Sequence, residues 1–436
     1  MLTAGRQALS GVREAASTVR ARRTTHVLAA IVLVPWVLGH PGTAAAQGRW
    51  SAPTLQESGI RYVSPSGRVR VDWSGRIDLE LLTLSAQEVG LVRGGGTFVS
   101  PRLSLFTDAA VGEHLKGLLE LRGDGGQAPT RGRLKGRVQQ AYLRWSGVSG
   151  RVSFQAGRFA SPFGSYATRA SSAGDPFVRP PLPYDYRTVI SRTTAPESPA
   201  AFLTWRDNPD AHRPEGAPPV WGVPYQWGVM GMGSVDRVSY RFAAMNGAPS
   251  SEPVTWGFDG ARFKHPSWIL GLRVPISPNL SAEASYDTGP YLQAVEAGTL
   301  PEGRSRWDYR QAVWSANLRF THRSVVASAE VLHDRWAVPN VGDDLVDMGY
   351  VGQVQAELGD GFVAGLRLSY LDFRPWRDTI GTPQPPWGYD VARWEGSLGY
   401  RFADNLGVLA SGFTDRHRGS GAPADNLGAI RLWWVF

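Results

Sequence analysis

The last twelve residues of the chain decide the fold, and they read DNLGAIRLWWVF (residues 425–436). From Gly428 onward, the side chains alternate between two faces. One face carries Ile430, Leu432, Trp434 and Phe436, and the other carries Ala429, Arg431 and Trp433. An alternation with period two predicts a β-strand, and the large apolar side chains predict that one face is shielded from water.

An amphipathic strand that ends the chain on phenylalanine resembles the assembly signal of bacterial outer-membrane β-barrels. Trp434 and Phe436 would be the aromatic residues of that signal. An ordinary half-buried strand that happens to end on phenylalanine has the same pattern. The rest of the sequence must therefore decide between the two.

The first 46 residues have the pattern of a secretory signal peptide. Five arginines precede an apolar run from His26 to Gly39, which is too short to span a bilayer as a helix, and small residues follow at 44–46. We predict cleavage after Ala46, with a short membrane anchor as the alternative. Without this segment, the formal net charge falls from +8 to +4. So mild a charge argues against nucleic-acid binding.

The predicted mature chain lacks the sequence motifs that are typical of catalysis or metal binding. It has no cysteine, so neither a disulfide framework nor a thiolate metal site is predicted. It has no run of 18 apolar residues, so no transmembrane helix is predicted. The motifs G-x-S-x-G, H-E-x-x-H and the P-loop are absent from the sequence. We expect no catalytic residue, no metal, no cofactor and no enzyme activity.

Sixteen segments after a polar lead-in at 47–68 have the strand pattern. In the first, 69–82, Val71, Trp73 and Leu79 point outward, whereas Arg70, Asp72 and Asp78 point inward. The others lie at 97–107, 113–123, 136–146, 150–158, 221–233, 236–246, 267–276, 279–288, 309–320, 324–334, 346–358, 361–373, 389–401, 405–415 and 425–436. In a membrane barrel, such strands turn the apolar face to lipid and the polar face to a wet lumen.

Short and long connections alternate along the chain. A barrel with short periplasmic turns and long outer loops requires this alternation, whereas a soluble two-sheet sandwich does not. The predicted fold is therefore all-β, a 16-stranded antiparallel up-and-down transmembrane β-barrel over 69–436, and the predicted location is the bacterial outer membrane. The last strand should pair with the first, because lipid leaves no partner for an open edge.

The longest connection, 159–220, is the main indication of function. It is rich in proline and aromatic residues, which suggests an ordered loop. We expect it to fold into the lumen as a constriction, and a lid outside the mouth is the alternative. Residues 200–205 suggest a short strand within it. The arginines of its first half are the predicted constriction residues, and these are Arg169, Arg179, Arg187 and Arg192.

Two hairpins resemble the phosphate-selective porin O and P family. The first has Gln140-Ala141-Tyr142-Leu143 and then Gly157-Arg158-Phe159 with Pro162-Phe163-Gly164. The second pairs Tyr225-Gln226-Trp227-Gly228 with a Phe242 to Gly247 segment. The resemblance covers roughly 136–247. It implies a sixteen-stranded outer-membrane porin that is often trimeric, that meets outer-membrane lipid and the barrel assembly machinery, and that passes small anionic or polar solutes.

Phosphate-selective members are known for lysines along the pore, whereas this chain has only Lys116, Lys135 and Lys264. Arginine can substitute as an anion contact. The predicted lumen-wall arginines are Arg144, Arg241, Arg319, Arg367, Arg393 and Arg431. Acidic residues share the inward face. The expected function is passive diffusion of small polar solutes with a mild preference for anions such as phosphate. The alternative is a non-conducting barrel that acts as an enzyme or as an adhesion or scaffold protein.

Overall fold

The computed structural model describes residues 59–126, 128–147, 151–167, 170, 174–207, 215–252, 262–293 and 300–436. The predicted signal peptide and residues 47–58 of the lead-in lie outside these ranges. No helix in the described part of the chain has the length and apolar character needed to cross a membrane.

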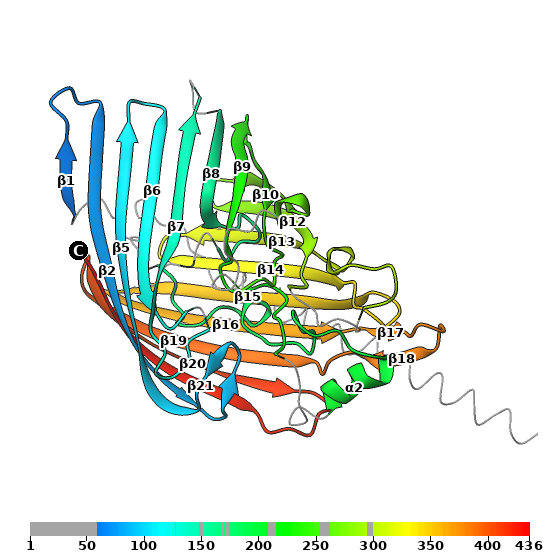
Figure 1. Ribbon diagram of the computed structural model, residues 1–436. Coiled ribbons are helices and arrows are strands. Elements are labelled where there is room, and N and C mark those ends of the chain that lie inside the picture. The colour runs from blue at the N-terminus through cyan, green and yellow to red at the C-terminus, as the bar shows by residue number, and fades with distance from the viewer. Residues whose placement is uncertain are drawn as a thin grey trace, which may run out of the picture. The chain divides into compact units, whose positions relative to one another are not determined.

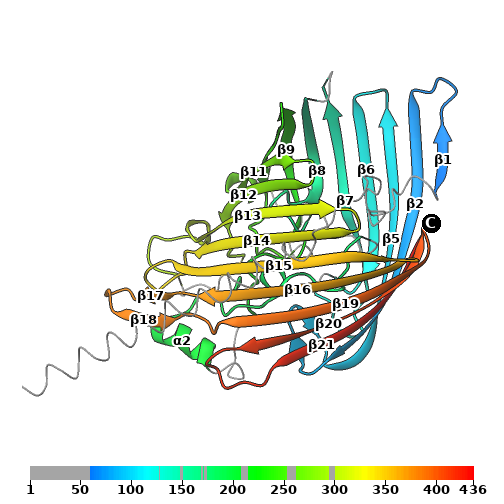
Figure 2. The ribbon, with the colours of Figure 1, turned by 180° about the vertical axis from the view of Figure 1, so that it is seen from behind.

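Sixteen antiparallel strands form a closed barrel, which confirms the predicted fold (Figures 1 and 2). They are β2 (Val69–Leu84), β5 (Gly96–Val111), β6 (Leu115–Asp124), β7 (Lys135–Ser146), β8 (Val152–Ala160), β9 (Tyr225–Val235), β10 (Val238–Met245), β11 (Ser267–Ser277), β12 (Leu280–Pro290), β13 (Arg310–His322), β14 (Val325–Trp336), β15 (Leu345–Gly359), β16 (Phe362–Phe373), β19 (Val391–Ala403), β20 (Leu406–His417) and β21 (Asp425–Val435). Each of these strands pairs with the next one along the chain, which is the up-and-down topology.

The barrel closes where the last strand pairs with the first, as the sequence predicts. The register runs from Arg76 opposite Val435 to Leu84 opposite Leu427. Phe436 follows β21 and extends the ladder by two backbone hydrogen bonds to Gly75. Figure 1 shows the C-terminus beside β2.

A short strand in the lead-in, β1 (Ile60–Val63), was not predicted. Residues 69–74 of β2 extend past the end of the chain in the ladder, so one edge of this stretch has no partner in the ring. β1 pairs with that edge, from Ile60 opposite Trp73 to Val63 opposite Arg70. Backbone groups at an open edge need hydrogen-bond partners, and β1 supplies them.

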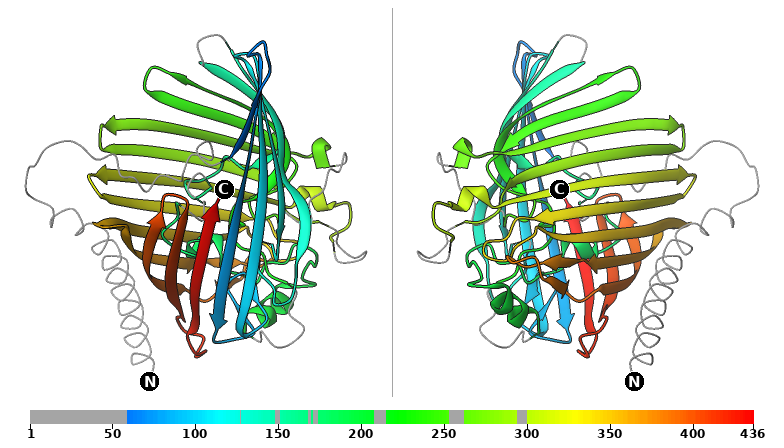
Figure 3. Two further views of the ribbon diagram at one scale, coloured as in Figure 1. Left: turned by 90° about the vertical axis from the view of Figure 1, so that its left-hand side faces the viewer. Right: turned by 90° about the vertical axis from the view of Figure 1, so that its right-hand side faces the viewer.

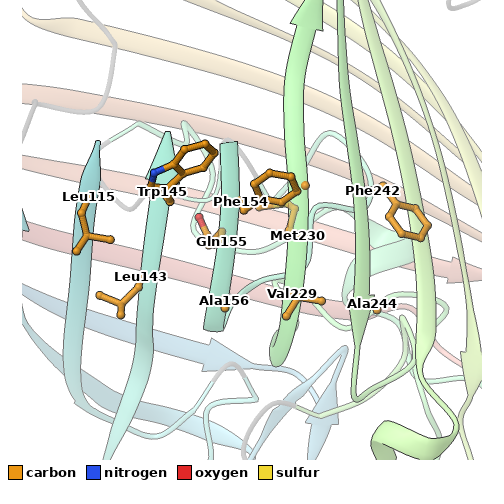
Figure 4. Close-up of a pocket in the computed structure, with 11 residues that line it drawn as sticks. Leu115, Leu143, Trp145, Phe154, Gln155, Ala156, Val229, Met230, Phe242 and Ala244 are labelled. Atoms are coloured by element: carbon orange, nitrogen blue, oxygen red, sulfur yellow. The ribbon is translucent and has the colours of Figure 1, made fainter. Parts of the chain in front are cut away.

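The predicted alternation of faces holds in the terminal strand. Ile430, Leu432 and Trp434 are 49%, 41% and 44% exposed on the outside, whereas Arg431 and Trp433 are 4% and 1% exposed on the inside. Figure 4 shows an apolar groove on the outer face of β6 to β10, where Leu143, Trp145, Phe154, Val229 and Phe242 lie exposed. An outer face of this kind suits contact with lipid.

Short and long connections alternate as predicted. Five of the hairpins turn within two residues, as between β9 and β10, whereas the loop between β8 and β9 spans 161–224. Long connections also hold β3 (Glu88–Val89), β4 (Val92–Arg93), β17 (Pro375–Arg377), β18 (Pro383–Pro386) and 3₁₀ turns at Leu182–Tyr184, Arg262–Lys264 and Arg306–Asp308.

The strand predicted at 200–205 is wrong, because this stretch is helical. It belongs to α2 (Pro199–Asp207), which lies near β17 and β18 in Figure 1, where Arg206 donates to the Pro386 carbonyl at 2.6 Å. Figure 3 shows the ribbon from two further sides. Ser198 caps the helix, since its hydroxyl accepts from the Ala201 N–H at 3.1 Å, and Pro199 occupies the first turn. A serine followed by a proline is a helix start that outweighs the short alternation after it.

Candidate functional site

The residues that carry the family resemblance position the start of the long loop. Gly157 adopts a φ of +135°, and a Cβ there would lie 2.2 Å from the Ala141 carbonyl oxygen. Phe159 and Phe163 follow it and are both 2% exposed. The backbone N–H of Gly164 donates to the Ser285 hydroxyl of β12 at 2.9 Å. The motif therefore turns the chain away from the wall and across the lumen.

The loop lies inside the barrel and covers the inner face of β9 to β16. Its residues Phe163, Tyr166 and Tyr184 pack in one cluster with inward side chains of β9, β10, β11, β13 and β14. Those side chains are Met230, Ala243, Met245, Ile269, Val313 and Leu332. A second cluster joins Leu182, Ile190 and Phe202 to the ends of β14, β15 and β16. This part of the lumen is a packed core, whereas a wet, polar lumen was expected.

Three arginines of the barrel wall hold the loop at residues 178–180. Arg431 of β21 donates to the Val178 carbonyl at 2.8 Å, Arg367 of β16 donates to the Arg179 carbonyl at 2.5 Å, and Arg393 of β19 donates to the Pro180 carbonyl at 3.3 Å. We call these three residues the arginine clamp. Each is also paired with an acid, and all are nearly fully buried. Three of the predicted lumen-wall arginines thus hold the loop.

Asp185 connects the loop to the clamp. Its carboxylate accepts from Arg393 at 3.0 Å and from Arg179, and Arg393 makes a two-point contact with Asp415 of β20. Burial alone would raise the pKa of Asp185, but Arg179 and Arg393 outweigh it and hold the pKa below its ordinary value of 3.8.

Beside the clamp, the loop leaves a small cavity against β2, β5 and β6. Its volume is about 80 Å³. Five arginines line it, together with one aspartate, Asp175. The arginines are Arg76, Arg102 and Arg122 of the wall, Arg179 of the loop and Arg431 of the clamp.

The wall acids near this cavity are buried and pair with its arginines. Asp78, Glu80 and Glu120 are at most 2% exposed, and none of them lines the cavity. Arg102 reaches Asp78 at 3.5 Å and Asp124 at 3.1 Å, and Arg122 reaches Glu120 at 2.6 Å. The lining of the cavity therefore carries the guanidinium groups, whereas these three carboxylates are not part of it.

The four loop arginines that the sequence predicts for the constriction have different surroundings. Arg179 lines the cavity. Arg187 and Arg192 are buried and pair with Glu215 at 2.8 Å and 3.5 Å, so they act within the loop core. Arg169 lies outside the described residues. Sequence reasoning did not select the wall residues Arg76, Arg102 and Arg122, although their inward position follows from the strand alternation.

The other predicted wall arginines lie closer to the short turns. Arg144 of β7 and Arg241 of β10 line a second, wider cavity. Arg319 of β13 stands opposite Ser281 of β12 and Ser328 of β14.

The pKa of Asp185 predicts how the loop responds to acid. A carboxylate with a lowered pKa contributes stability that is present above its unfolded pKa and is lost as the pH falls through its folded pKa. The long loop should therefore keep the contribution of Asp185 at neutral pH and lose it only below the ordinary carboxyl pKa of 3.8, when Asp185 takes up a proton. Hydrogen exchange of the loop backbone in the folded barrel, corrected for the intrinsic pH dependence of exchange, should show this acid-induced loosening in the wild type and not in Asp185→Asn. A loosening step above pH 4 that Asp185→Asn abolishes would contradict the assignment.

No protein-family model matches the sequence, and neither does any curated protein. Solved structures of bacterial outer-membrane proteins do resemble the barrel. An anion-selective porin from Comamonas acidovorans is 11% identical with a TM-score of 0.52, over 84% of this chain and 100% of that chain. The outer membrane channel DcaP of Acinetobacter baumannii is 11% identical with a TM-score of 0.52, over 86% and 99%. OprB of Pseudomonas putida is 12% identical with a TM-score of 0.51, over 84% and 94%. The chain therefore has the sixteen-stranded barrel fold of outer-membrane porins.

Proposed function

We propose that the protein is a channel of the bacterial outer membrane, through which small polar solutes diffuse passively and anions pass more readily than cations. The apolar outer face and the porin fold support the channel. The preference for anions rests on one observation, the five arginines that line the small cavity between the loop and the wall. One of the similar structures is described as an anion-selective porin.

The position of these arginines matters more than the net charge of the lumen. At physiological salt, a wide aqueous pore screens a wall charge within about 8 Å. A narrow passage with low-dielectric walls focuses the field and brings the ion into contact with a few groups. The planar guanidinium suits phosphate and carboxylate oxygens, so anions such as phosphate are the proposed solutes. The trimeric state implied by the family resemblance is a further proposal, which cross-linking of the membrane-embedded protein tests.

The proposal predicts a change of selectivity when the wall arginines are neutralised. In a potassium chloride gradient across a planar bilayer, the wild-type reversal potential should indicate chloride preference. In Arg76→Gln/Arg102→Gln/Arg122→Gln, the chloride-to-potassium permeability ratio should fall by about threefold or more, because the field at the cavity is lost.

Two variants serve as controls for this measurement. Replacing the same three arginines by lysine should keep the sign of the selectivity, since the charge remains. Arg304→Gln removes an exposed arginine between β12 and β13 that does not line the cavity, and it should leave the reversal potential unchanged. Cation preference in the wild type, or an unchanged ratio in the glutamine variant, would refute the assignment.

A non-conducting barrel that acts as an enzyme or as an adhesion or scaffold protein is the alternative, which the porin fold does not favour. The same bilayer experiment separates the two candidates. Stepwise conductance of the wild type supports the channel, whereas its absence in correctly folded protein supports the scaffold or the enzyme.

A further inference from the structure

A second cavity lies inside the barrel, at the end with the short turns. Its volume is about 610 Å³, which is in the range of pockets that bind small organic molecules. Residues of β7 to β11 and the first residues of the long loop line it. Ser234 and Ser239 flank the turn between β9 and β10 and lie at its rim. We call this cavity the vestibule.

Three arginines line the vestibule, and they come from β7, β10 and β11. Arg144 donates to the Gln155 side-chain oxygen from Nε at 2.9 Å and from Nη2 at 2.6 Å, so a neutral partner fixes its guanidinium and leaves Nη1 available. Arg241 donates to the Pro162 carbonyl at 2.6 Å and pairs with Glu283. Arg273 of β11 is exposed, and within the described ranges neither Arg273 nor Arg144 has an acidic partner. Glu283, which pairs with Arg241, also stands opposite Arg273 in the ladder between β11 and β12, so the vestibule carries three guanidinium groups near one carboxylate.

The remaining lining of the vestibule is apolar and partly aromatic. Phe159, Pro162, Met230 and Met232 line it together with the ring of Tyr142. Tyr142 and Phe159 meet edge to face, with ring centroids 6.3 Å apart. Aromatic faces and polarizable methionines favour contact with another ring. An inorganic anion would meet the arginines and leave this surface uncovered, and a neutral aromatic molecule would leave the arginines unmatched.

We infer that the vestibule binds a small carboxylate with an aromatic body. The carboxylate would accept hydrogen bonds from Arg144, with Arg273 adding positive charge from the far edge of the vestibule, and the ring would lie against Met232 and the ring of Tyr142. Charge-assisted hydrogen bonds from a planar guanidinium fit a carboxylate in two-point geometry. This inference names a solute class for the proposed channel and so rests on that proposed function, because the solute reaches the vestibule through the pore.

Three probes distinguish binding of the carboxylate from binding of the aromatic ring. Benzoate has both the ring and the carboxylate, acetate has only the carboxylate, and benzyl alcohol has only the ring. Isothermal titration with the folded protein in detergent should show that benzoate binds at least about tenfold more tightly than either of the other two, because only benzoate meets both surfaces. In planar bilayers, benzoate should also cause brief current blockades. Equal affinity for benzoate and acetate would overturn the inference.

Variants locate the site. Arg144→Gln/Arg273→Gln should weaken benzoate binding by about tenfold, since the charged hydrogen bonds are lost. Met232→Ser should weaken benzoate binding and leave acetate binding unchanged. Arg237→Gln is the matched control, because it removes a positive charge from the turn between β9 and β10 without altering the lining. Wild-type benzoate affinity in Arg144→Gln/Arg273→Gln, with a normal heat-modifiable barrel, would also overturn the inference.

The outcomes for the inference and for the proposed function can be told apart. Titration does not require conduction, so it tests the vestibule even in a barrel that passes no current. A conducting, anion-preferring barrel without benzoate binding would refute the vestibule assignment alone. A barrel that binds benzoate and never conducts would refute the channel alone.

Discussion

Deletion of Phe436 should leave most of the newly made protein outside folded, membrane-inserted barrels. The Phe436 N–H donates to the Gly75 carbonyl at 2.9 Å, and its own carbonyl accepts from the Gly75 N–H at 2.6 Å. Its ring lies 4.9 Å from that of Trp434. The last residue therefore completes the ladder that closes the barrel, and a barrel in lipid tolerates no open edge. The resemblance to an assembly signal adds the expectation that the assembly machinery reads these two aromatic residues.

The fraction of heat-modifiable barrel in the outer-membrane fraction measures this effect. We expect it to fall by about fivefold or more after deletion or in Phe436→Asp, because a charge beside the bilayer is costly. Phe436→Tyr should assemble normally. Gly75→Val should resemble the deletion, since a Cβ at Gly75 would lie 2.3 Å from the Phe436 ring. Barrels that do assemble should keep wild-type selectivity. A normal barrel level after deletion would refute the role of Phe436.

The strands of the barrel could be predicted because each satisfies a local rule. Period-two alternation marks the strand, and the order of short and long connections marks the topology. β1 was not predicted, because the alternation in its four residues does not differ from that of the rest of the lead-in. Its pairing with β2 also depends on where β21 ends. The start of β9 was misplaced at 221, because Trp221 and Val223 are apolar enough for a strand but pack in the loop core.

The arginines of the small cavity could have been predicted by comparing the inward positions of the strands with one another. Several inward positions are apolar on β9 to β14, as at Met230, Ile269 and Leu332, whereas β2, β5 and β6 place arginines inward, as at Arg102 and Arg122. An apolar inner wall must be covered, so the long loop packs against it and leaves the charged wall open. The pairing of Arg187 and Arg192 with Glu215 could not be predicted, because it depends on the fold of the loop itself.

Arg393→Met should release the long loop and raise the single-channel conductance severalfold. Arg393 is 1% exposed and binds Asp185 of the loop and Asp415 of β20. Its loss leaves the buried Asp415 without its partner and Asp185 with Arg179 alone, and breaking a buried ion pair typically costs about 3–5 kcal/mol. The barrel has its own closed backbone ladder, so the cost should fall on the loop. Anion preference should weaken as well, because Arg179 would leave the cavity with the loop.

A second variant separates release of the loop from loss of folding. Arg393→Met/Asp185→Asn/Asp415→Asn removes the unpaired charges along with the arginine, so conductance should return part of the way to the wild-type value. Arg416→Gln, which neutralises an exposed arginine of β20, is the control and should conduct normally. Heat-modifiability shows that each barrel is folded before its conductance is compared. Wild-type conductance in a folded Arg393→Met barrel would mean that the apolar clusters alone hold the loop. The arginine clamp would then stabilise the barrel wall, where Arg367 pairs with Glu395 and Arg431 pairs with Glu80.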